Sequence, residues 1–135
     1  MKITYTDGYK YQLSKDYFHR LSFQPGITNA SDWITIYEDG RITIRAGYAW
    51  DGPSGPTYDT KSSMRGALVH DALYQMMRDE LLPRMWRDEA DKEMKRLMKE
   101  DGMWSWRAYL WYKSVRKFAG WAASPKNRKK QYIAP

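Results

Sequence analysis

One segment separates this chain into two halves with different hydrophobic periods. Residues 46–60 contain three Gly and two Pro, a content that a regular helix or strand does not tolerate. Before this segment, apolar and polar residues alternate in short runs, as in β-strands; after it, apolar residues recur every three or four positions, as in helices. The sequence therefore predicts an α+β fold: a small N-terminal antiparallel sheet, a Gly/Pro loop and a three-helix unit.

The strand pattern is clearest in a predicted hairpin. Residues 33–37 and 41–45 are rich in β-branched side chains and are separated by Glu38-Asp39-Gly40. Asp-Gly tolerates the positive φ of a tight turn, so the two runs are expected to pair. Shorter strands are predicted over residues 3–5 and 9–13.

Three helices are predicted after the loop. The first begins at Ser62 or Ser63, either of which can cap it, and ends at about Arg78. Leu82-Pro83 interrupts the pattern, and Asp101-Gly102 ends the next helix. The second and third helices are expected over residues 84–100 and 104–119.

Composition limits both the architecture and the chemistry. The 135 residues suit one domain, over residues 1–123, followed by a basic tail, residues 124–135. The absence of Cys excludes disulfides, thiolate metal sites and cysteine nucleophiles, and two His leave any metal to bind mostly through oxygen. Neither a signal peptide nor a transmembrane segment is expected. A formal net charge of +7 favours anionic partners.

A group of chemically active side chains lies on the first two predicted helices. His70, Asp71 and Tyr74 fall within one turn of the first helix. A short connection makes the second helix antiparallel, and about 13 Å of rise from Asp71 to the turn is matched by about 10 Å back to Asp91. We therefore expect Asp91 to hydrogen-bond His70, fixing its tautomer and leaving the other ring nitrogen free as a base. Arg87 is expected to pair with Asp91 at i, i+4.

The Gly/Pro loop precedes this helix and suits a hard cation. Glycines in residues 47–53 permit tight turns that aim backbone carbonyls inward, and Asp51 adds a carboxylate. The competing interpretation is that Asp51 and Ser54 make turn hydrogen bonds to nearby amides.

Two families resemble this arrangement. Asp51-Gly-Pro-Ser54-Gly-Pro56, His70-Asp71-Ala-Leu-Tyr74 and Ala90-Asp91 resemble motifs of domain-of-unknown-function family 1353, found in phage and bacterial proteins. That resemblance covers residues 47–120 and brings no activity. It implies a protein of the host cytoplasm or the phage virion.

The His-Asp-x-x-Tyr motif with the preceding Gly47-Tyr48-Ala-Trp-Asp-Gly52-Pro53 is also similar to calcium-dependent phospholipase A2, most closely the parvovirus capsid form. By that similarity His70 activates water, and Asp91 with Tyr74 orients it. Asp71 then binds calcium together with the loop, at Tyr48, Trp50 and Gly52. Asp51 is not part of the lipase pattern but is a further candidate ligand.

Alternatives remain open at this level. The His-Asp-Tyr-Asp cluster could be a buried structural network in a virion, tail-associated or accessory protein, or the site of another metal-dependent hydrolase using manganese or zinc. The expected partners are an anionic lipid surface or other phage structural proteins. No groove-reading motif accompanies the basic tail, so nucleic acid is not expected, and His19 receives no role.

The aromatic residues of the third helix also have two interpretations. Most of them are expected to be core, with an apolar face of Trp104, Ala108, Trp111, Val115 and Phe118. The alternative is a lipid–water boundary, which places aromatic and basic side chains together on one surface. The residues in question are Trp104, Trp106, Tyr109, Tyr112 and Trp121 with Lys113, Arg116 and Lys117.

Overall fold

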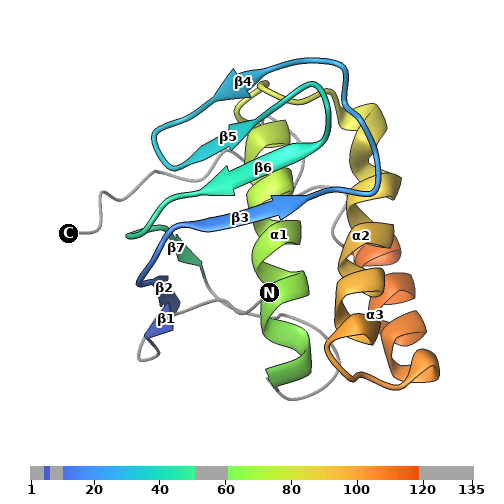
Figure 1. Ribbon diagram of the computed structural model, residues 1–135. Coiled ribbons are helices and arrows are strands. Elements are labelled where there is room, and N and C mark those ends of the chain that lie inside the picture. Colours follow the sequence, from blue (N-terminus) through green and yellow to red (C-terminus); the bar gives the residue numbers. More distant parts are fainter. Residues whose placement is uncertain (1–4, 7–10, 51–60, 119–135) are drawn as a thin grey trace.

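The structure, a computed structural model, describes residues 5–6, 11–50 and 61–118 and has the predicted α+β architecture (Figure 1). The strands are β1 (Tyr5–Thr6), β2 (Tyr11–Leu13), β3 (Tyr17–Arg20), β4 (Asn29–Ala30), β5 (Ile34–Ile36), β6 (Arg41–Ile44) and β7 (Ala49–Trp50). The helices are α1 (Lys61–Arg78), the one-turn 3-10 helix η1 (Arg84–Trp86), α2 (Arg87–Glu100) and α3 (Ser105–Phe118).

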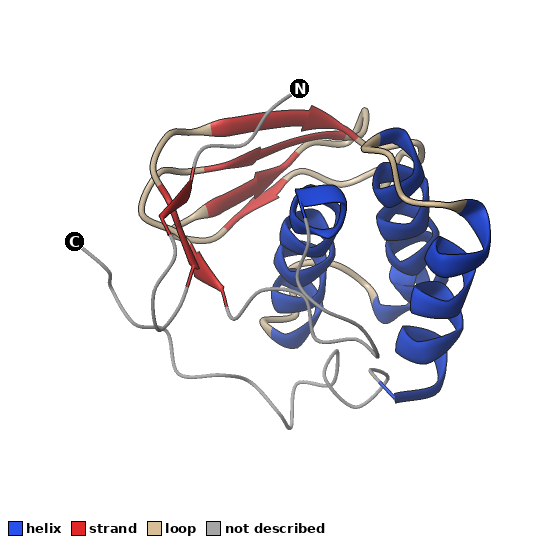
Figure 2. Ribbon diagram, turned by 90° about the horizontal axis from the view of Figure 1, so that it is seen from below, coloured by secondary structure: helices blue, strands red, loops and turns tan. Residues whose placement is uncertain are grey.

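The strands form two antiparallel sheets. One has the order β3-β6-β5-β4 and the other β1-β2-β7. Figure 2 shows the helices on one side of the four-stranded sheet. The predicted hairpin is confirmed, with Ile36 opposite Ile42. Its turn requires glycine, because Gly40 has φ +98° and a Cβ there would lie 2.6 Å from the Phe23 carbonyl oxygen.

Several strands differ from the prediction because they depend on partners distant in sequence. β3 and β4 carry no clear local pattern, but they pair with β6 and β5 at the two edges of the hairpin. β7 lies inside the segment predicted to be loop throughout, and that part of the prediction is wrong. Ala49 is held opposite Gln12 of β2, whose ladder stabilises two residues of extended chain.

The helices follow the predicted order with corrected ends. α1 begins at Lys61, so Ser62 and Ser63 lie in its first turn and not at the N-cap position that was predicted for one of them. The second predicted helix divides into η1 and α2. Gly102, at φ +104°, follows α2 and permits the turn into α3. Within the described ranges, the structure contains no helix with the length and apolar character needed to cross a membrane.

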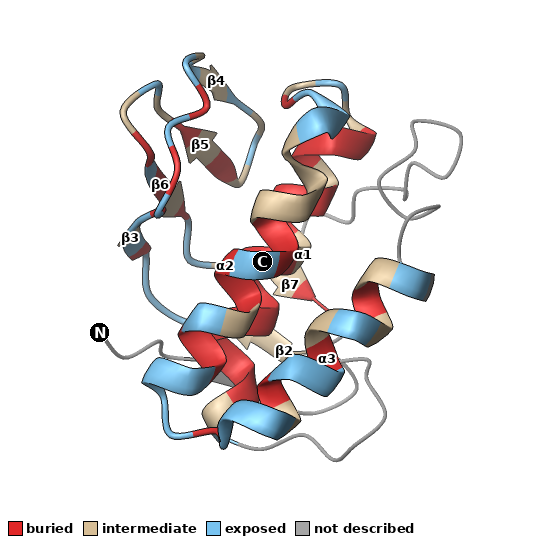
Figure 3. Ribbon diagram, turned by 90° about the vertical axis from the view of Figure 1, so that its right-hand side faces the viewer, coloured by how far each residue is buried: buried red, intermediate tan, exposed pale blue. Residues whose placement is uncertain are grey.

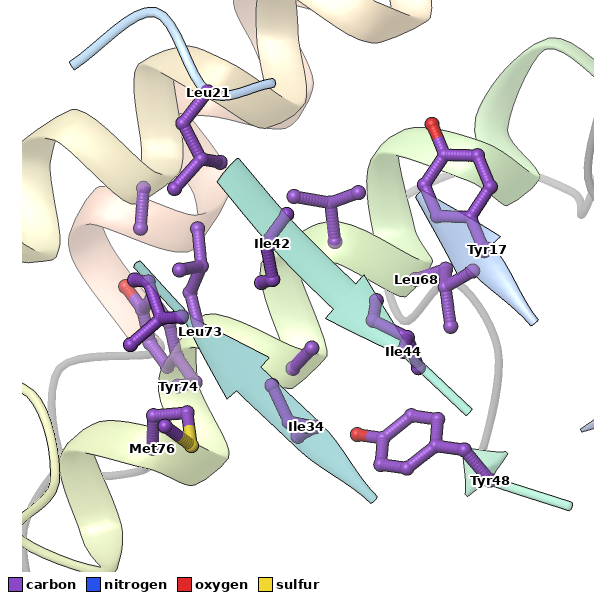
Figure 4. Packing of buried hydrophobic residues seen from close by; sticks show 14 of the residues in the cluster. Tyr17, Leu21, Ile34, Ile42, Ile44, Tyr48, Leu68, Leu73, Tyr74 and Met76 are labelled. Carbon is purple, nitrogen blue, oxygen red and sulfur yellow. The ribbon is translucent and has the colours of Figure 1, made fainter. Parts of the chain in front are cut away.

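The main core lies between the four-stranded sheet and α1. Ile34, Ile42 and Ile44 of the sheet pack with Leu68 and Leu73 of α1, and all five are buried (Figure 4). A second cluster joins α2 to α3 through residues including Met94, Met98 and Trp111. The two cores thus fix α1 against the sheet and hold α2 and α3 together. The predicted domain boundary at residue 123 and the tail lie outside the described residues.

Candidate functional site

The centre of the site is a hydrogen bond between α1 and α2. His70 Nε2 donates to Asp91 Oδ1 over 2.7 Å, and both side chains are buried. The two helices are brought antiparallel by a tight connection in which Glu80 has φ +60° and the amides of Leu81 and Leu82 donate to the Met76 carbonyl. The prediction that His70 and Asp91 lie within hydrogen-bond reach is confirmed.

Asp91 accepts hydrogen bonds on both carboxylate oxygens. The Tyr74 hydroxyl donates to the same Oδ1 over 2.6 Å, and Arg116 Nη1 of α3 donates to Oδ2 over 3.0 Å. The side chain of Asp91 is 0% exposed, so these three donors replace the water that an ionised carboxylate requires. The predicted contact of Tyr74 with this group is therefore present, whereas the contribution of Arg116 was not predicted.

Arg87 does not form the predicted pair with Asp91. In the described parts of the chain, no ion pair within 4.0 Å joins these two residues. Arg87 Nε instead donates to the Tyr74 hydroxyl oxygen over 3.1 Å, and Nη2 donates to the carbonyls of Val115 and Arg116. The reason is geometric: Asp91 turns toward α1 and α3, and the last carbonyls of α3 offer acceptors to Arg87.

The carboxylates determine the protonation of the site. Burial alone would lower the pKa of His70, but the neighbouring Asp71 and Asp91 outweigh it, and the pKa is raised above 6.5. Burial and the hydrogen bond to Asp91 together raise the pKa of Tyr74, which therefore remains a neutral donor. The His70 imidazole is thus held at Nε2 by the Asp91 carboxylate oxygen.

Asp71 lies on the other side of the imidazole. Its Oδ1 is 3.8 Å from His70 Nδ1, beyond a direct hydrogen bond, and its side chain is 36% exposed. Nδ1 therefore faces a second, accessible carboxylate. This is the side on which a base would meet a water molecule and on which Asp71 could contribute to a cation site.

The rest of the predicted calcium ligands are only partly described. Asp51 and Gly52 lie outside the described residues. The Tyr48 carbonyl accepts the Leu13 amide over 2.8 Å, and Trp50 is a buried residue of β7. No group of three or more His, Cys, Asp or Glu placed to hold a metal ion occurs among the residues that the structure describes. The metal assignment therefore stays a prediction.

The structure contains a second histidine–carboxylate pair that the sequence did not predict. His19 Nε2 of β3 donates to Glu93 Oε2 of α2 over 2.8 Å, and Ser22 and Arg96 donate to the same carboxylate. Burial alone would raise the pKa of Glu93, but its hydrogen bonds from His19, Arg96 and Ser22 lower the pKa to about 2. The one feature of the sequence that could have indicated this pair is Glu93 itself, an acidic residue on the apolar face of the second helix.

Comparisons with known proteins give no assignment: the chain matches no family model, no curated protein and no solved structure.

Proposed function

We propose that this protein is a phage-encoded, calcium-dependent lipid esterase with a phospholipase A2-like site. The observation that carries the proposal is the buried Asp91 carboxylate, which accepts hydrogen bonds from both His70 Nε2 and the Tyr74 hydroxyl. A histidine oriented in this way is the arrangement that general-base catalysis of ester hydrolysis requires.

The chain's own residues then have distinct roles. Asp91 keeps the proton on His70 Nε2, so that Nδ1 carries the free electron pair. Nδ1 accepts a proton from a water molecule as that water attacks the ester carbonyl carbon. The resulting imidazolium is stabilised by Asp91 and Asp71, whose carboxylates already raise the pKa of His70. It then returns the proton to the leaving alcohol oxygen as the bond between that oxygen and the carbonyl carbon breaks.

The proposed cation would be held by Asp71. Its carboxylate is partly exposed beside the free nitrogen of His70, and an oxygen donor of that kind suits a hard divalent ion. The further ligands are those predicted for the Gly/Pro loop, namely Asp51 and the segment containing Tyr48, Trp50 and Gly52. A calcium ion bound there supplies electrostatic stabilisation of the oxyanion that forms during ester hydrolysis.

Two substitutions of the same type test the two roles. The assay is fatty-acid release from mixed anionic vesicles, with calcium or with a chelator, alongside calcium titration calorimetry. Asp71→Asn should abolish calcium binding and reduce activity about a hundredfold or more, while stability changes little because the side chain is partly exposed. Asp91→Asn should retain calcium binding but lose activity, since the His70 tautomer is no longer fixed.

Glu89→Gln is the matched control, because Glu89 is also on α2 but its partly exposed carboxylate lies beside Lys92 at the surface, away from the His70–Asp91 site. It should retain both binding and activity. No ester hydrolysis by the parent protein with calcium would contradict the proposal. Activity on a phosphate ester with manganese or zinc would instead favour another metal-dependent hydrolase.

One observation favours a second candidate, a non-enzymatic virion, tail-associated or accessory protein. Asp91 is fully buried, and its three donors come from α1 and α3, so the cluster ties three helices together. On this hypothesis Asp91→Asn costs roughly 1 to 3 kcal/mol of stability. The parent protein would bind no divalent cation and hydrolyse no ester.

A further inference from the structure

The outer surface of α3 is unusually apolar for a solvent-facing helix. Trp104, which immediately precedes the helix, and Trp106, Tyr109 and Leu110 within it are between 47% and 71% exposed. The Trp104 and Trp106 rings lie 6.1 Å apart between centroids. Figure 3 shows exposed residues along the side of α3 that faces away from α2. The expectation that most aromatic residues of the third helix are core is therefore wrong for Trp104, Trp106 and Tyr109.

These side chains occupy one side of the helix. Positions 106, 109, 110, 113 and 117 follow the three- and four-residue spacing of a single helical stripe, and all five are exposed. The opposite side supplies Ala108, Trp111 and Val115 to the core shared with α2. α3 therefore has two apolar sides, only one of which packs against the described protein.

The charge on this side is entirely basic. α3 contains no Asp or Glu, and its four basic residues are Arg107, Lys113, Arg116 and Lys117. Arg116 turns inward to Asp91, but Lys113 and Lys117 continue the exposed stripe beyond the aromatic residues. The Lys113 ammonium lies 6.0 Å from the centre of the Tyr109 ring. An occupant of this surface must accept aromatic side chains and carry negative charge.

We propose that the α3 aromatic face, consisting of Trp104, Trp106, Tyr109, Leu110, Lys113 and Lys117, docks on an anionic lipid bilayer. Trp and Tyr prefer the depth of the lipid headgroups, where the ring is in an apolar layer and its polar edge stays hydrated. Lysines beside them extend their stems along that layer and place their ammonium groups among anionic phosphates. An amphipathic helix lying in the interface plane has the same distribution of side chains.

The observations favour lipid over other anionic partners. Leu110, in the middle of the face, offers no ring on which a nucleobase could stack, whereas it suits an acyl layer. The face also lacks any carboxylate, which a second copy of the same surface would need in order to neutralise the lysines.

The inference deepens the proposed function and rests on it for its biological meaning, since a lipid esterase must meet its substrate at a bilayer. α3 links the two regions, because Arg116 on its inner side donates to the catalytic-site carboxylate of Asp91. Docking on the bilayer and hydrolysis are nevertheless separate measurements, and either can fail alone.

The test is co-sedimentation with vesicles of equal parts phosphatidylglycerol and phosphatidylcholine, in chelator so that hydrolysis does not contribute. The parent protein should bind, and should bind less at high salt. Trp104→Ala/Trp106→Ala should weaken binding about tenfold or more. Lys113→Gln and Lys117→Gln should each weaken it about fivefold. Phe18→Ala, which removes an exposed aromatic from β3, is the matched control and should bind as the parent does.

Several outcomes would overturn the inference. They are the absence of parental binding to these vesicles, equal weakening by Phe18→Ala, and unchanged binding after both the tryptophan and the lysine substitutions. Binding of single-stranded DNA without vesicle binding would assign the face to nucleic acid. A concentration-dependent dimer lost in Trp104→Ala/Trp106→Ala would assign it to a second copy. Vesicle binding without fatty-acid release in calcium would retain this inference and remove the proposed esterase activity.

Discussion

Asp91 and Glu93 lie two positions apart on α2, and both are completely buried carboxylates. Because two helical positions differ by about 200°, they point to opposite sides of the helix. Asp91 meets His70 of α1, and Glu93 meets His19 of β3. Both histidines of the chain are thus paired with buried acids, and each pair joins α2 to a different neighbouring element. Burial of these charges is tolerated because each carboxylate oxygen has a donor.

The Glu93 pair predicts an acid limit to stability. Its pKa falls from 4.5 to about 2 on folding, so the stabilisation is complete above pH 4.5 and is lost as the pH falls toward 2. Glu93→Gln should remove up to about 3 kcal/mol of this pH-dependent stability. Urea unfolding at a series of pH values measures it. Glu89→Gln, a partly exposed position on α2, should leave the acid profile unchanged.

The His70 pair predicts the opposite dependence. Because its folded pKa is raised above 6.5, its contribution to stability is complete below pH 6.5 and is lost as the pH rises through the folded value. An activity that needs the neutral imidazole should appear only above that value. NMR titration of the histidine ring signals should show a lower His70 pKa in Asp71→Asn. An unchanged pKa in this variant would show that Asp71 does not act on the ring.

At the scale of elements, the separation of α1 and α2 depends on one small residue. A Cβ at Gly66 would lie 2.9 Å from the Met94 carbonyl oxygen and 3.0 Å from Met98 Cγ. The helices can therefore approach closely only while this position is glycine. That approach is what brings His70 and Asp91 within 2.7 Å.

Gly66→Ala should therefore destabilise the protein by about 1 to 2 kcal/mol, although alanine is the better helix former. Thermal unfolding measures the change. Gly102→Ala is the control, since a Cβ there meets nothing within 4 Å and any loss reflects only the positive φ of +104°. The packing argument fails if Gly66→Ala is as stable as the parent, or more so.

Local sequence predicted some elements better than others for a physical reason. Asp39-Gly40 specifies its own turn, so the β5–β6 hairpin could be read from neighbouring residues. β3 and β4 are defined by hydrogen bonds to strands elsewhere in the chain, and their own residues have no comparable signal. The predicted helix over residues 84–100 starts instead with the 3-10 turn η1, which likewise follows from the course of the chain after Pro83.

At the scale of the whole molecule, the sheet and the first helix share one core. Ile44 of β6 and Leu73 of α1 are both fully buried in the same cluster. Neither half can bury its apolar surface without the other, so the described region is expected to unfold as one cooperative unit.

Far-UV circular dichroism and tryptophan fluorescence should therefore report the same unfolding transition. Ile44→Ala and Leu73→Ala should each lower the free energy of unfolding by about 2 to 5 kcal/mol, because each leaves a cavity in the shared core. Both signals should report the same loss. Phe18→Ala, at an exposed position on β3, should shift neither signal appreciably. Two separate transitions, with the helical signal surviving in Ile44→Ala, would show that the helices fold independently.

The sequence by itself determined that strands precede three helices and that His70, Tyr74 and Asp91 lie close together, because hydrophobic periodicity and a short connection are local properties. Only the tertiary structure decided that Arg116 completes the Asp91 site and that Trp104 remains on the surface. These outcomes depend on which distant elements meet. Hydrophobic period specifies that a face is apolar, but the packing of the whole chain decides whether anything covers it.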